Sequence, residues 1–349
     1  MNDRITLDYG SGGLKTSELI DSVLLPAFDN PLLTELGDGA VLADTGGSGL
    51  VFSTDSFVVT PWRFPGGDIG KLSVCGTVND LCMAGGTPRY LSLSLILEEG
   101  FPIADLKEII ASVAAEARKC SVMIVTGDTK VVESGKGDGI YINTSGIGLR
   151  RAVLPGKSGI RPGDAVLISG TAGCHGTAVM MARAGLLDEG SPLVSDCAPL
   201  HRISAAVLEA AQQTSNASGG SADAVAVRIL RDPTRGGVAT TLNEFSEGMP
   251  FSIELIQNDI PVDPVVEAAC DMLGLDPLYC ACEGRMLVVC APEKAEAVLA
   301  AMRTLPEGKD AARIGTVTED MPGKVLLKTP IGGHRILTKL TGMQLPRIC

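Results

Sequence analysis

The chain has 349 residues, of which 45% are hydrophobic, 20% charged and only 3% aromatic. This composition supports well-packed cores, and the length exceeds one ordinary domain of about 150 residues, so we expect two domains. With 29 basic and 41 acidic residues the net charge is −12, which argues against nucleic acid and anionic membranes as partners. Residues 1–10 lack the apolar segment of a signal peptide, and no apolar run approaches the ~20 residues of a membrane span, so we expect a cytoplasmic protein.

The first half of the chain alternates expected strands and helices. Apolar runs predict strands at Leu50–Val59, Tyr90–Leu97, Val122–Val132 and Gly139–Leu149, the last two joined by a glycine-rich turn. Apolar residues at helical spacing predict helices at Ile69–Ala84 and Ile103–Lys119. This order is typical of a mixed α/β domain.

The segment Pro155–Asp164, bounded by glycine and proline, is the expected domain junction. Beyond it the patterns predict three strands and four helices, at Ala165–Ser169, Phe251–Ile256 and Arg285–Val289, and at Gly176–Ala184, Leu200–Gln212, Val238–Glu247 and Pro292–Arg303. We therefore assign residues 1–155 to an N-terminal domain and 156–338 to a C-terminal domain. Residues 339–349 show no periodicity, and we expect a tail that is free to move.

Polar residues interrupt the apolar segments of the first domain. Asp55 lies in an expected strand, Asn79 and Asp80 in an expected helix, and Asp128 in another strand. A carboxylate among apolar residues is destabilising unless it is paired, hydrogen-bonded or bound to metal. Each carboxylate alone is equally well explained as a helix cap or a turn former. Together with Asp38 they favour a site for Mg²⁺ and nucleotide phosphates, because Mg²⁺ prefers hard oxygen ligands.

Three further polar segments leave alternatives open. The run Gly10–Gly13 could bring backbone N–H groups close to phosphate, although such a run is more often a flexible turn. Lys130, beside Asp128, could meet a γ-phosphate or a substrate proton, but taken alone it is more simply a lysine that faces solvent. In the segment Arg231–Gly237, the polar residues either cap the following helix or form an anion site at its start.

Glu283 follows Cys280-Ala281-Cys282 and precedes an apolar strand. We expect a partly buried carboxyl there, whose pKa desolvation raises and which is a strong base once ionised; a surface charge at a strand end is the alternative. Cys280 and Cys282 would share one face of a strand. With Cys290 they suggest a thiolate metal site, but the chain offers no second cysteine pair of metal-site spacing and no histidine cluster, so core packing is favoured.

Cys349 is the last residue and follows a segment without periodicity. Burial does not readily explain a cysteine in such a tail, and an exposed thiol is a redox liability unless its reactivity is used. We therefore expect Cys349 to be a reactive thiol, whereas the other cysteines are expected to be reduced core residues.

Seven motifs are spread along nearly the whole chain. They are GSGG from Gly10, STDSFVVTP from Ser53, PGGDIGKLSVCGTVNDL from Pro65, VTGDTKVV from Val125, RDPTRGGV from Arg231, EG at Glu283 and the terminal PRIC. In these motifs the chain resembles the HypE family of hydrogenase maturation factors, within the superfamily of aminoimidazole ribonucleotide synthetase, selenophosphate synthetase and thiamine-phosphate kinase. The terminal PRIC is the most specific motif, because the wider superfamily shares the fold and the acidic ATP site but lacks that tail.

The resemblance implies an ATP-dependent carbamoyl dehydratase that serves the cyanide ligand of nickel–iron hydrogenases. The carbamoyltransferase HypF would load a carbamoyl group onto the sulfur of Cys349, and the dehydratase would convert it to a thiocyanate. Iron held by a HypC–HypD complex would then receive the cyano group. Phosphorylation turns the amide oxygen into a good leaving group, and loss of the N–H protons then forms the nitrile.

The resemblance also implies site residues. Cys349 would carry the substrate, Glu283 would act as the base, and Lys130 would place charge at the phosphate or relay a proton. The implied nucleotide contacts are Gly12, Gly13, Asp38, Asp55, Asn79, Asp80, Asp128, Thr129, Asp232, Thr234 and Arg235. The implied Mg²⁺ ligands are Asp38, Asp55, Asp80 and Asp128.

The fold that the resemblance implies is mixed α/β with two domains. An N-terminal mixed sheet would pair across a homodimer into a barrel-like ATP-binding unit, followed by a C-terminal α/β sandwich-like domain. A small-molecule synthetase or kinase of the same superfamily, in which Cys349 is incidental, is one alternative. A carrier without enzymatic activity, whose terminal thiol binds iron or a partner, is another; ATP turnover would exclude it.

Overall fold

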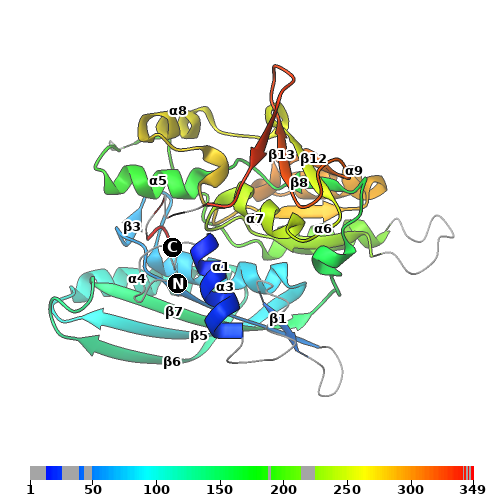
Figure 1. The fold of residues 1–349 in the computed structure, drawn as a ribbon. Coiled ribbons are helices and arrows are strands. Elements are labelled where there is room, and N and C mark those ends of the chain that lie inside the picture. The colour runs from blue at the N-terminus through cyan, green and yellow to red at the C-terminus, as the bar shows by residue number, and fades with distance from the viewer. Residues whose placement is uncertain are drawn as a thin grey trace.

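The computed structural model describes residues 13–25, 39–42, 49–187, 190–213, 225–340, 342, 345 and 347–349. Its strands form two large mixed sheets, one from each half of the chain, with helices between them (Figure 1). A short helix, α1 (Leu14–Leu19), precedes the first sheet. Within the described ranges, no helix combines the length and the apolar character that a bilayer crossing requires.

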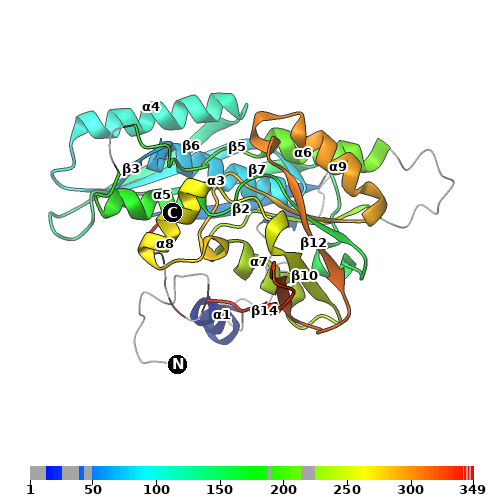
Figure 2. The ribbon, with the colours of Figure 1, turned by 90° about the horizontal axis from the view of Figure 1, so that it is seen from above.

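The first sheet has the strand order β1-β2-β7-β5-β6, in which β5 and β6 run parallel and all other neighbours antiparallel. Its strands are β1 (Ala40–Leu42), β2 (Leu50–Phe57), β7 (Ile140–Arg150), β5 (Gly86–Glu98) and β6 (Met123–Val132). Helices α3 (Ile69–Met83) and α4 (Ile103–Lys119) lie side by side on one face of this sheet (Figure 2). The opposite face, at the bottom of Figure 1, is not covered by any helix of the described chain.

The second sheet has the order β14-β13-β10-β12-β8-β11-β9. Its strands are β14 (His334–Leu337), β13 (Val325–Lys328), β10 (Ser252–Ile256), β12 (Ala312–Thr318), β8 (Ala165–Ile168), β11 (Leu287–Cys290) and β9 (Val227–Arg231). Alternate residues of β8 belong to two cores, one with helices α6 (His201–Gln213) and α9 (Ala295–Arg303), the other with α7 (Gly237–Ser246). Both faces of this sheet are therefore buried, which explains its uninterrupted apolar strands. Helices α5 (Cys174–Arg183) and α8 (Pro264–Leu273) pack together beside it.

Helix α3 connects the two halves of the molecule. Its apolar residues pack in one core with the first sheet and with β8, β9 and α6, so it is buried on all sides. The carboxamide oxygen of Asn79 accepts the N–H of Leu200 at 2.7 Å. Its nitrogen donates to the carbonyl oxygens of Ala198 at 3.2 Å and Glu283 at 3.3 Å. These bonds hold the segments around Ala198 and Glu283, which belong to the second half of the chain, at the end of helix α3.

The mixed α/β class is confirmed, and most expected elements lie within a few residues of the observed ones. Helix α4 occupies the expected residues Ile103–Lys119. The turn between β6 and β7 does not make them neighbours, because β5 lies between them. The sequence analysis missed helix α8 and strands β9, β12, β13 and β14, which are short or interrupted by glycine and charged residues.

Candidate active site

The sulfur of Cys349 lies inside the molecule, between the two halves of the chain. The side chain of Arg235 donates from Nε to Cys349 Sγ at 3.0 Å, and Cys349 is 7% exposed. The main chain of the tail continues along the segment after β2, where Val58 N–H donates to the Cys349 carbonyl at 3.1 Å. Backbone hydrogen bonds thus hold the last residues in place and bury the thiol in this conformation. A tail that is free to move stays a prediction.

Three carboxyl groups form an electrostatic cluster at this site: Asp55 in β2, Asp232 after β9, and Glu283 before β11. Asp55 and Glu283 act on both Cys349 and Arg235, and Asp232 interacts with these two carboxyl groups. Burial is the main cause that raises the pKa of Glu283 well above its ordinary value and that of Asp232 to about 6. Burial also raises the pKa of Asp55. The cluster therefore resists the accumulation of negative charge and suits a bound cation or proton transfer.

The Cys349 thiol and the Arg235 guanidinium respond to the same surroundings. Burial, reinforced by the charges of Glu283 and Asp55, raises the pKa of Cys349 to about 12, and Arg235 only partly opposes this. The nearby sulfur, more than any other group, raises the pKa of Arg235. In the docked position Cys349 is thus a neutral thiol, which fits a substrate carrier better than an attacking nucleophile.

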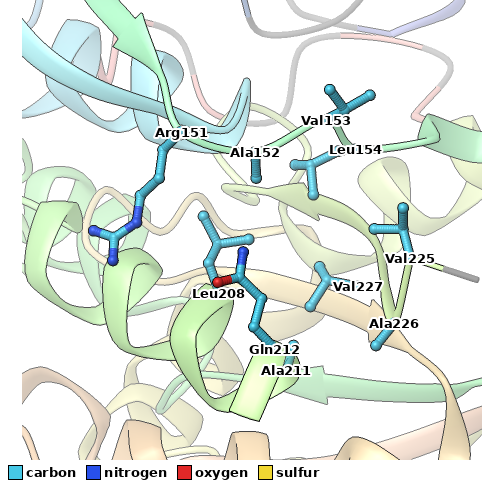
Figure 3. A pocket seen from close by; sticks show the side chains of 10 residues that line it. All are labelled: Arg151, Ala152, Val153, Leu154, Leu208, Ala211, Gln212, Val225, Ala226 and Val227. Carbon is cyan, nitrogen blue, oxygen red and sulfur yellow. The ribbon is translucent and has the colours of Figure 1, made fainter. Parts of the chain in front are cut away.

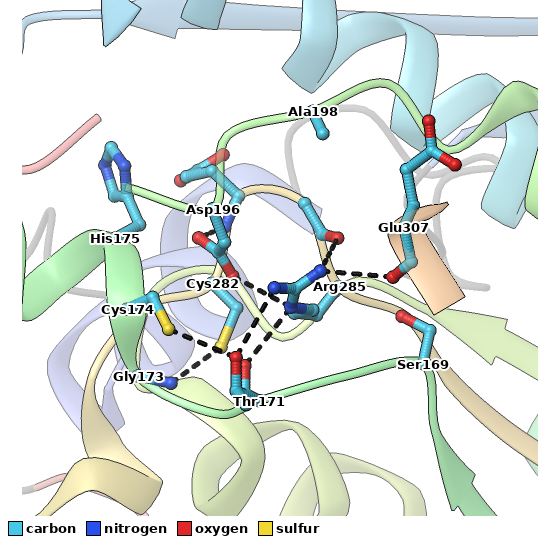
Figure 4. Close-up of polar contacts among 12 residues, drawn as sticks. Ser169, Thr171, Gly173, Cys174, His175, Asp196, Ala198, Cys282, Arg285 and Glu307 are labelled. Atoms are coloured by element: carbon cyan, nitrogen blue, oxygen red, sulfur yellow. Dashed lines mark hydrogen bonds and ion pairs between the residues drawn. The ribbon is translucent and has the colours of Figure 1, made fainter. Parts of the chain in front are cut away.

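Glu283 is held by its backbone in a rigid loop. Asp196 accepts the Glu283 N–H at 3.1 Å, and Arg285 pairs with the same carboxylate at 3.5 Å (Figure 4). Arg285 also donates to the carbonyl oxygen of Thr171 at 3.2 Å. A Cβ on Gly284 would lie 1.9 Å from the Asp196 carbonyl oxygen, so only glycine allows this approach. Asp196 was not among the expected site residues, because its neighbours in the sequence do not indicate that Glu283 and Arg285 bind its carboxylate.

The cysteines before Glu283 do not lie in a strand as expected, because they follow a 3₁₀ turn at Pro277–Tyr279. Cys282 Sγ accepts the N–H of Gly173 at 3.1 Å (Figure 4), and the sulfurs of Cys280 and Cys270 are 3.8 Å apart. All ten cysteines are free and buried, so the buried placement favoured for this pair is what the structure shows.

The loop between β9 and α7 carries Asp232, Thr234 and Arg235. Helix α7 begins after Gly236, and no side chain caps it, so the alternative in which Asp232 or Thr234 caps the helix is wrong. Gly236 and Gly237 both have positive φ, at 80° and 60°. A Cβ on Gly237 would lie 2.6 Å from the Leu278 carbonyl oxygen. The paired glycines therefore turn the chain sharply and leave Asp232 and Arg235 at the buried cluster.

Two neighbours on α3 differ in their surroundings. Asp80 Oδ2 accepts a hydrogen bond from Ser53 of β2 at 2.6 Å. Asn79 is completely buried, and main-chain groups use both ends of its carboxamide. The nucleotide contact implied for Asn79 is therefore not available in this arrangement, and its observed role is to join the two halves.

Asp128, Thr129 and Lys130 lie away from the cluster. Asp128 and Lys130 lie two residues apart on strand β6, and their side chains form an ion pair at 2.6 Å. The hydrogen bond from Lys130 is the main cause that lowers the pKa of Asp128. They lie opposite Ser94 and Ile96 of β5, on the sheet face without helices.

Asp55, by contrast, lies on the face of the first sheet that α3 covers. A Cβ on Gly76 of that helix would be 3.5 Å from Asp55 Oδ2. In the register Asp55 matches Thr144 of β7, then Leu93 of β5, then Gly127 of β6. Three strand spacings are about 14 Å. Within one chain, Lys130 and Asp128 are therefore on the other face of the sheet and three strands away from Asp55.

Two expected residues, Gly12 and Asp38, fall outside the described residues. Gly13 precedes helix α1, and its carbonyl oxygen accepts the N–H of Ser17 at 3.1 Å. The expected metal ligands that the structure does describe are thus divided: Asp55 and Asp80 lie between β2 and α3, whereas Asp128 does not join them.

Buried oxygens at the cluster indicate where a cation fits. Asp232 Oδ2 and Glu283 Oε1 are buried and have no hydrogen-bond partner. A buried, unsatisfied carboxylate oxygen costs about 1–3 kcal/mol unless a cation or a proton satisfies it. Asp232, which was not among the expected metal ligands, thus has a buried carboxylate oxygen without a hydrogen-bond partner, whereas the carboxylate of Asp128 pairs with Lys130.

A separate hollow of about 320 Å³ lies between the domain junction and helix α6 (Figure 3). It is lined by Arg151, Ala152, Val153, Leu154, Leu208, Ala211, Gln212, Val225, Ala226 and Val227. None of the expected site residues contributes to it.

Comparisons with known proteins cover nearly the whole chain. Residues 36–150 match the N-terminal domain, and residues 161–328 the C-terminal domain, of AIR synthase related protein. Carbamoyl dehydratase HypE of Cupriavidus necator is 50% identical over 99% of this chain and 95% of its own length. A solved HypE–HypF complex holds a chain that is 42% identical, with a TM-score of 0.82, over 92% of this chain and 99% of that one. A HypE structure in complex with ATP is 44% identical, with a TM-score of 0.78, over 99% of this chain and 100% of that one.

Proposed function

The chain belongs to the HypE family of carbamoyl dehydratases, and we propose that its own Cys349 carries the S-carbamoyl group that it dehydrates. It is an ATP-dependent enzyme of hydrogenase maturation, whose product is a thiocyanate. The observation that supports Cys349 as the carrier is its burial beside Arg235 and the carboxyl cluster that includes Glu283. A superfamily kinase or synthetase would have no use for a cysteine seated there.

The residues of the cluster divide the chemistry among them. ATP supplies the phosphoryl group with which the amide oxygen leaves as phosphate, and Mg²⁺ supplies positive charge for that transfer. Glu283 accepts an N–H proton of the carbamoyl nitrogen; because burial raises its pKa, its ionised form is a strong base. Arg235 holds the sulfur and places positive charge beside the reacting carbon. Burial of the sulfur excludes water, which would hydrolyse an activated amide.

In the part of the chain that the structure describes, no three acidic, histidine or cysteine side chains come together as a complete metal site. We propose that Asp55, Asp80 and Asp232 contact a Mg²⁺ ion that the nucleotide phosphates and water also bind. The unpartnered Oδ2 of Asp232 supports this assignment, as do the positions of Asp55 and Asp80 between β2 and α3. Carboxylate oxygens are the ligands that Mg²⁺ shares with substrate phosphates.

An Asp232→Asn variant tests the cation site through stability as well as activity. The folded-state pKa of Asp232 is raised from 3.8 to about 6, so its ionised form destabilises the metal-free protein as pH rises through that range. At pH 7.5 we expect the variant without Mg²⁺ to be more stable by about 3 kcal/mol, and ATP-dependent dehydration to fall. Urea unfolding in EDTA measures the first effect. A lower stability of the variant at pH 7.5 would contradict the assignment, and the difference should vanish below about pH 3.

We propose that two copies of the chain pair through the uncovered face and edge of the first sheet. Nearly all of β6 is exposed, including Met123, Val125 and Val131 at 58%, 59% and 66%. Exposed apolar residues on an edge strand promote aggregation unless a partner covers them. In the described part of the chain, β1 pairs only with residues 50–52 of β2, which leaves the edge beside Asp55 open. A barrel of two copies would set β6 of each against that edge of the other.

This pairing would give Asp128, Thr129 and Lys130 a place at the active site. Lys130 is three strands away from Asp55 of its own chain, whereas β6 of a partner subunit would lie next to the strand that carries Asp55, close enough for the long Lys130 side chain to reach round the edge to a nucleotide bound there. There it would meet the nucleotide phosphates or relay the second N–H proton. Asp128, Thr129 and Lys130 would thus have the function that the resemblance implies, but in the active site of the partner subunit.

The remaining partners and the domain limits are also proposals. HypF would load the carbamoyl group, because a similar chain is found in a HypE–HypF complex, and a HypC–HypD complex would receive the cyano group. Ten free cysteines fit the reducing cytoplasm. Domain limits of 1–155 and 156–338 agree with the strands, since the first sheet ends at Arg150 and the second begins at Ala165. We further propose that the tail, residues 339–349, leaves its docked position to be loaded.

The direct test of function is a mass measurement on carbamoylated protein. On incubation with Mg-ATP we expect the protein to lose the mass of one water, located in the peptide that contains Cys349. A nonhydrolysable ATP analogue should leave the mass unchanged, and a Cys349→Ala variant should acquire no carbamoyl group. An unchanged mass of the loaded wild-type protein after ATP hydrolysis would refute the function.

A further inference from the structure

The last three residues are held mainly through their backbone. Thr60 N–H donates to the carbonyl oxygen of Arg347 at 3.3 Å, and Val58 N–H to that of Cys349 at 3.1 Å. The Arg347 side chain returns a bond from Nε to the Val58 carbonyl oxygen at 3.0 Å and pairs with Asp138. Main-chain hydrogen bonds therefore hold the tail beside residues 58–60, although neither segment forms a regular strand.

His175, at the start of α5, binds the remaining carbonyl of the tail. Its Nε2 lies 2.6 Å from the carbonyl oxygen of Ile348, and its Nδ1 lies 2.7 Å from Ser195 Oγ. Ser195 Oγ already accepts the N–H of Cys197 at 3.0 Å, so its own hydroxyl proton is free to go to Nδ1. Nε2 then carries the ring proton and donates it to Ile348.

The ring of His175 is preset for this bond. Phe64 packs edge-on against it, with the ring centroids 5.3 Å apart and the planes at 87°. His175 is completely buried, and burial lowers its pKa, so the neutral ring is maintained at physiological pH. A neutral imidazole with a fixed tautomer is a donor suited to a carbonyl oxygen.

Arg183, at the other end of α5, adds a second contact. Its Nη2 donates to the carbonyl oxygens of Thr60 and Arg347, both at 2.6 Å. It thereby joins the tail to the segment beside which the tail lies. Between these contacts the side chain of Ile348 is 2% exposed in the apolar cluster that also holds Phe57 and Val179.

We propose that His175 is a positioning residue for the dehydration, which together with Arg183 seats the tail so that the Cys349 sulfur lies beside Arg235. Its meaning for catalysis rests on the proposed function. Both residues bind main-chain carbonyls and neither binds the sulfur, so thiol, S-carbamoyl and thiocyanate forms can be seated by the same contacts. The contacts that position the tail are therefore different from the groups that act at the sulfur and its substituent, which are Arg235 and Glu283.

The rate at which iodoacetamide alkylates Cys349 in the native full-length protein measures seating. After reaction, cleavage at lysine yields residues 340–349, whose mass reports Cys349 alone. His175→Ala removes one buried hydrogen bond, and we expect Cys349 to react about tenfold faster. His175→Gln retains an N–H donor and should restore much of the protection. His201→Ala alters a histidine of the same half that does not contact the tail and should react like the wild type.

The other nine cysteines provide the internal control. If His175 served only overall stability, His175→Ala would expose all ten thiols together, and that result would overturn the proposal. An unchanged Cys349 rate in both His175→Ala and Arg183→Gln would overturn it as well. Arg183 is partly exposed, so its variant remains informative if His175→Ala does not fold.

A double variant links seating to turnover. In His175→Ala/Arg183→Gln we expect single-turnover dehydration to slow in proportion to the loss of the seated fraction. A double variant with rapid Cys349 alkylation but wild-type dehydration would overturn the positioning role. If carbamoylated wild-type protein loses no water with Mg-ATP while Cys349 protection still depends on His175, the proposed function fails and the seating role stands.

Discussion

A Glu283→Gln variant is expected to bind ATP normally and to form the nitrile about 10²- to 10⁴-fold more slowly than the wild type, the usual loss when a general base is removed. Glutamine has nearly the same shape but no basic oxygen. The loop should keep its position, because Asp196 and Asn79 bind the backbone of Glu283 and not its side chain. Single-turnover mass spectrometry of the carbamoylated variant measures the rate.

The Glu283→Gln variant should also differ from the wild type in the pH dependence of its stability. Burial raises the pKa of Glu283 well above its ordinary value, so the ionised form destabilises the metal-free protein at high pH. The neutral amide should therefore not lower the melting temperature in alkaline buffer. Glu254→Gln, a change in strand β10 where the glutamate pairs with His334 on the surface, should leave dehydration unchanged. Wild-type turnover by Glu283→Gln would exclude it as the base.

Mixing two inactive variants is expected to restore activity if Lys130 serves the partner's site. Lys130→Ala lacks the relay, and Cys349→Ala lacks the carrier, so each homodimer should be inactive. After subunit exchange about half of the dimers are mixed, and one of the two sites in each joins a native Cys349 to a native Lys130. We expect about a quarter of wild-type activity per protein.

The arrangement within one chain predicts the opposite outcome. If Lys130 acted on Cys349 of its own chain, no mixed dimer would hold a complete site, and the mixture would stay inactive. Intact-mass dehydration assays on exchanged and unexchanged mixtures separate the two cases. As a control for exchange itself, Val125→Asp on β6 should weaken dimer formation in light scattering and suppress the recovery.

Structural features that depend on neighbouring residues in the sequence could be predicted from its local patterns. Helix α4 follows from an amphipathic repeat, and the strands of the first sheet follow from apolar runs ended by glycine. Glu283 was correctly expected to be buried with a raised pKa, since apolar neighbours and Gly284 flank it in sequence.

Contacts between distant segments could not be predicted in this way. Cys349 is bound by residues 58 and 235, and His175 binds the tail across about half of the chain. The position of Lys130 depends on the strand order, which places β5 between β6 and β7, and a turn sequence does not reveal that order. The nucleotide contact of Asn79 was implied by the resemblance, which does not reveal that backbone groups of the second half bind both ends of its carboxamide.

The burial of α3 on every side has a consequence for the folding of the protein. Because one core unites this helix with β8, β9 and α6, the two domains that we propose on either side of residue 155 share their packing, and we do not expect them to unfold as independent units. The first half made alone would expose an apolar helix, so we expect it to reach its native packing only once the second half is present.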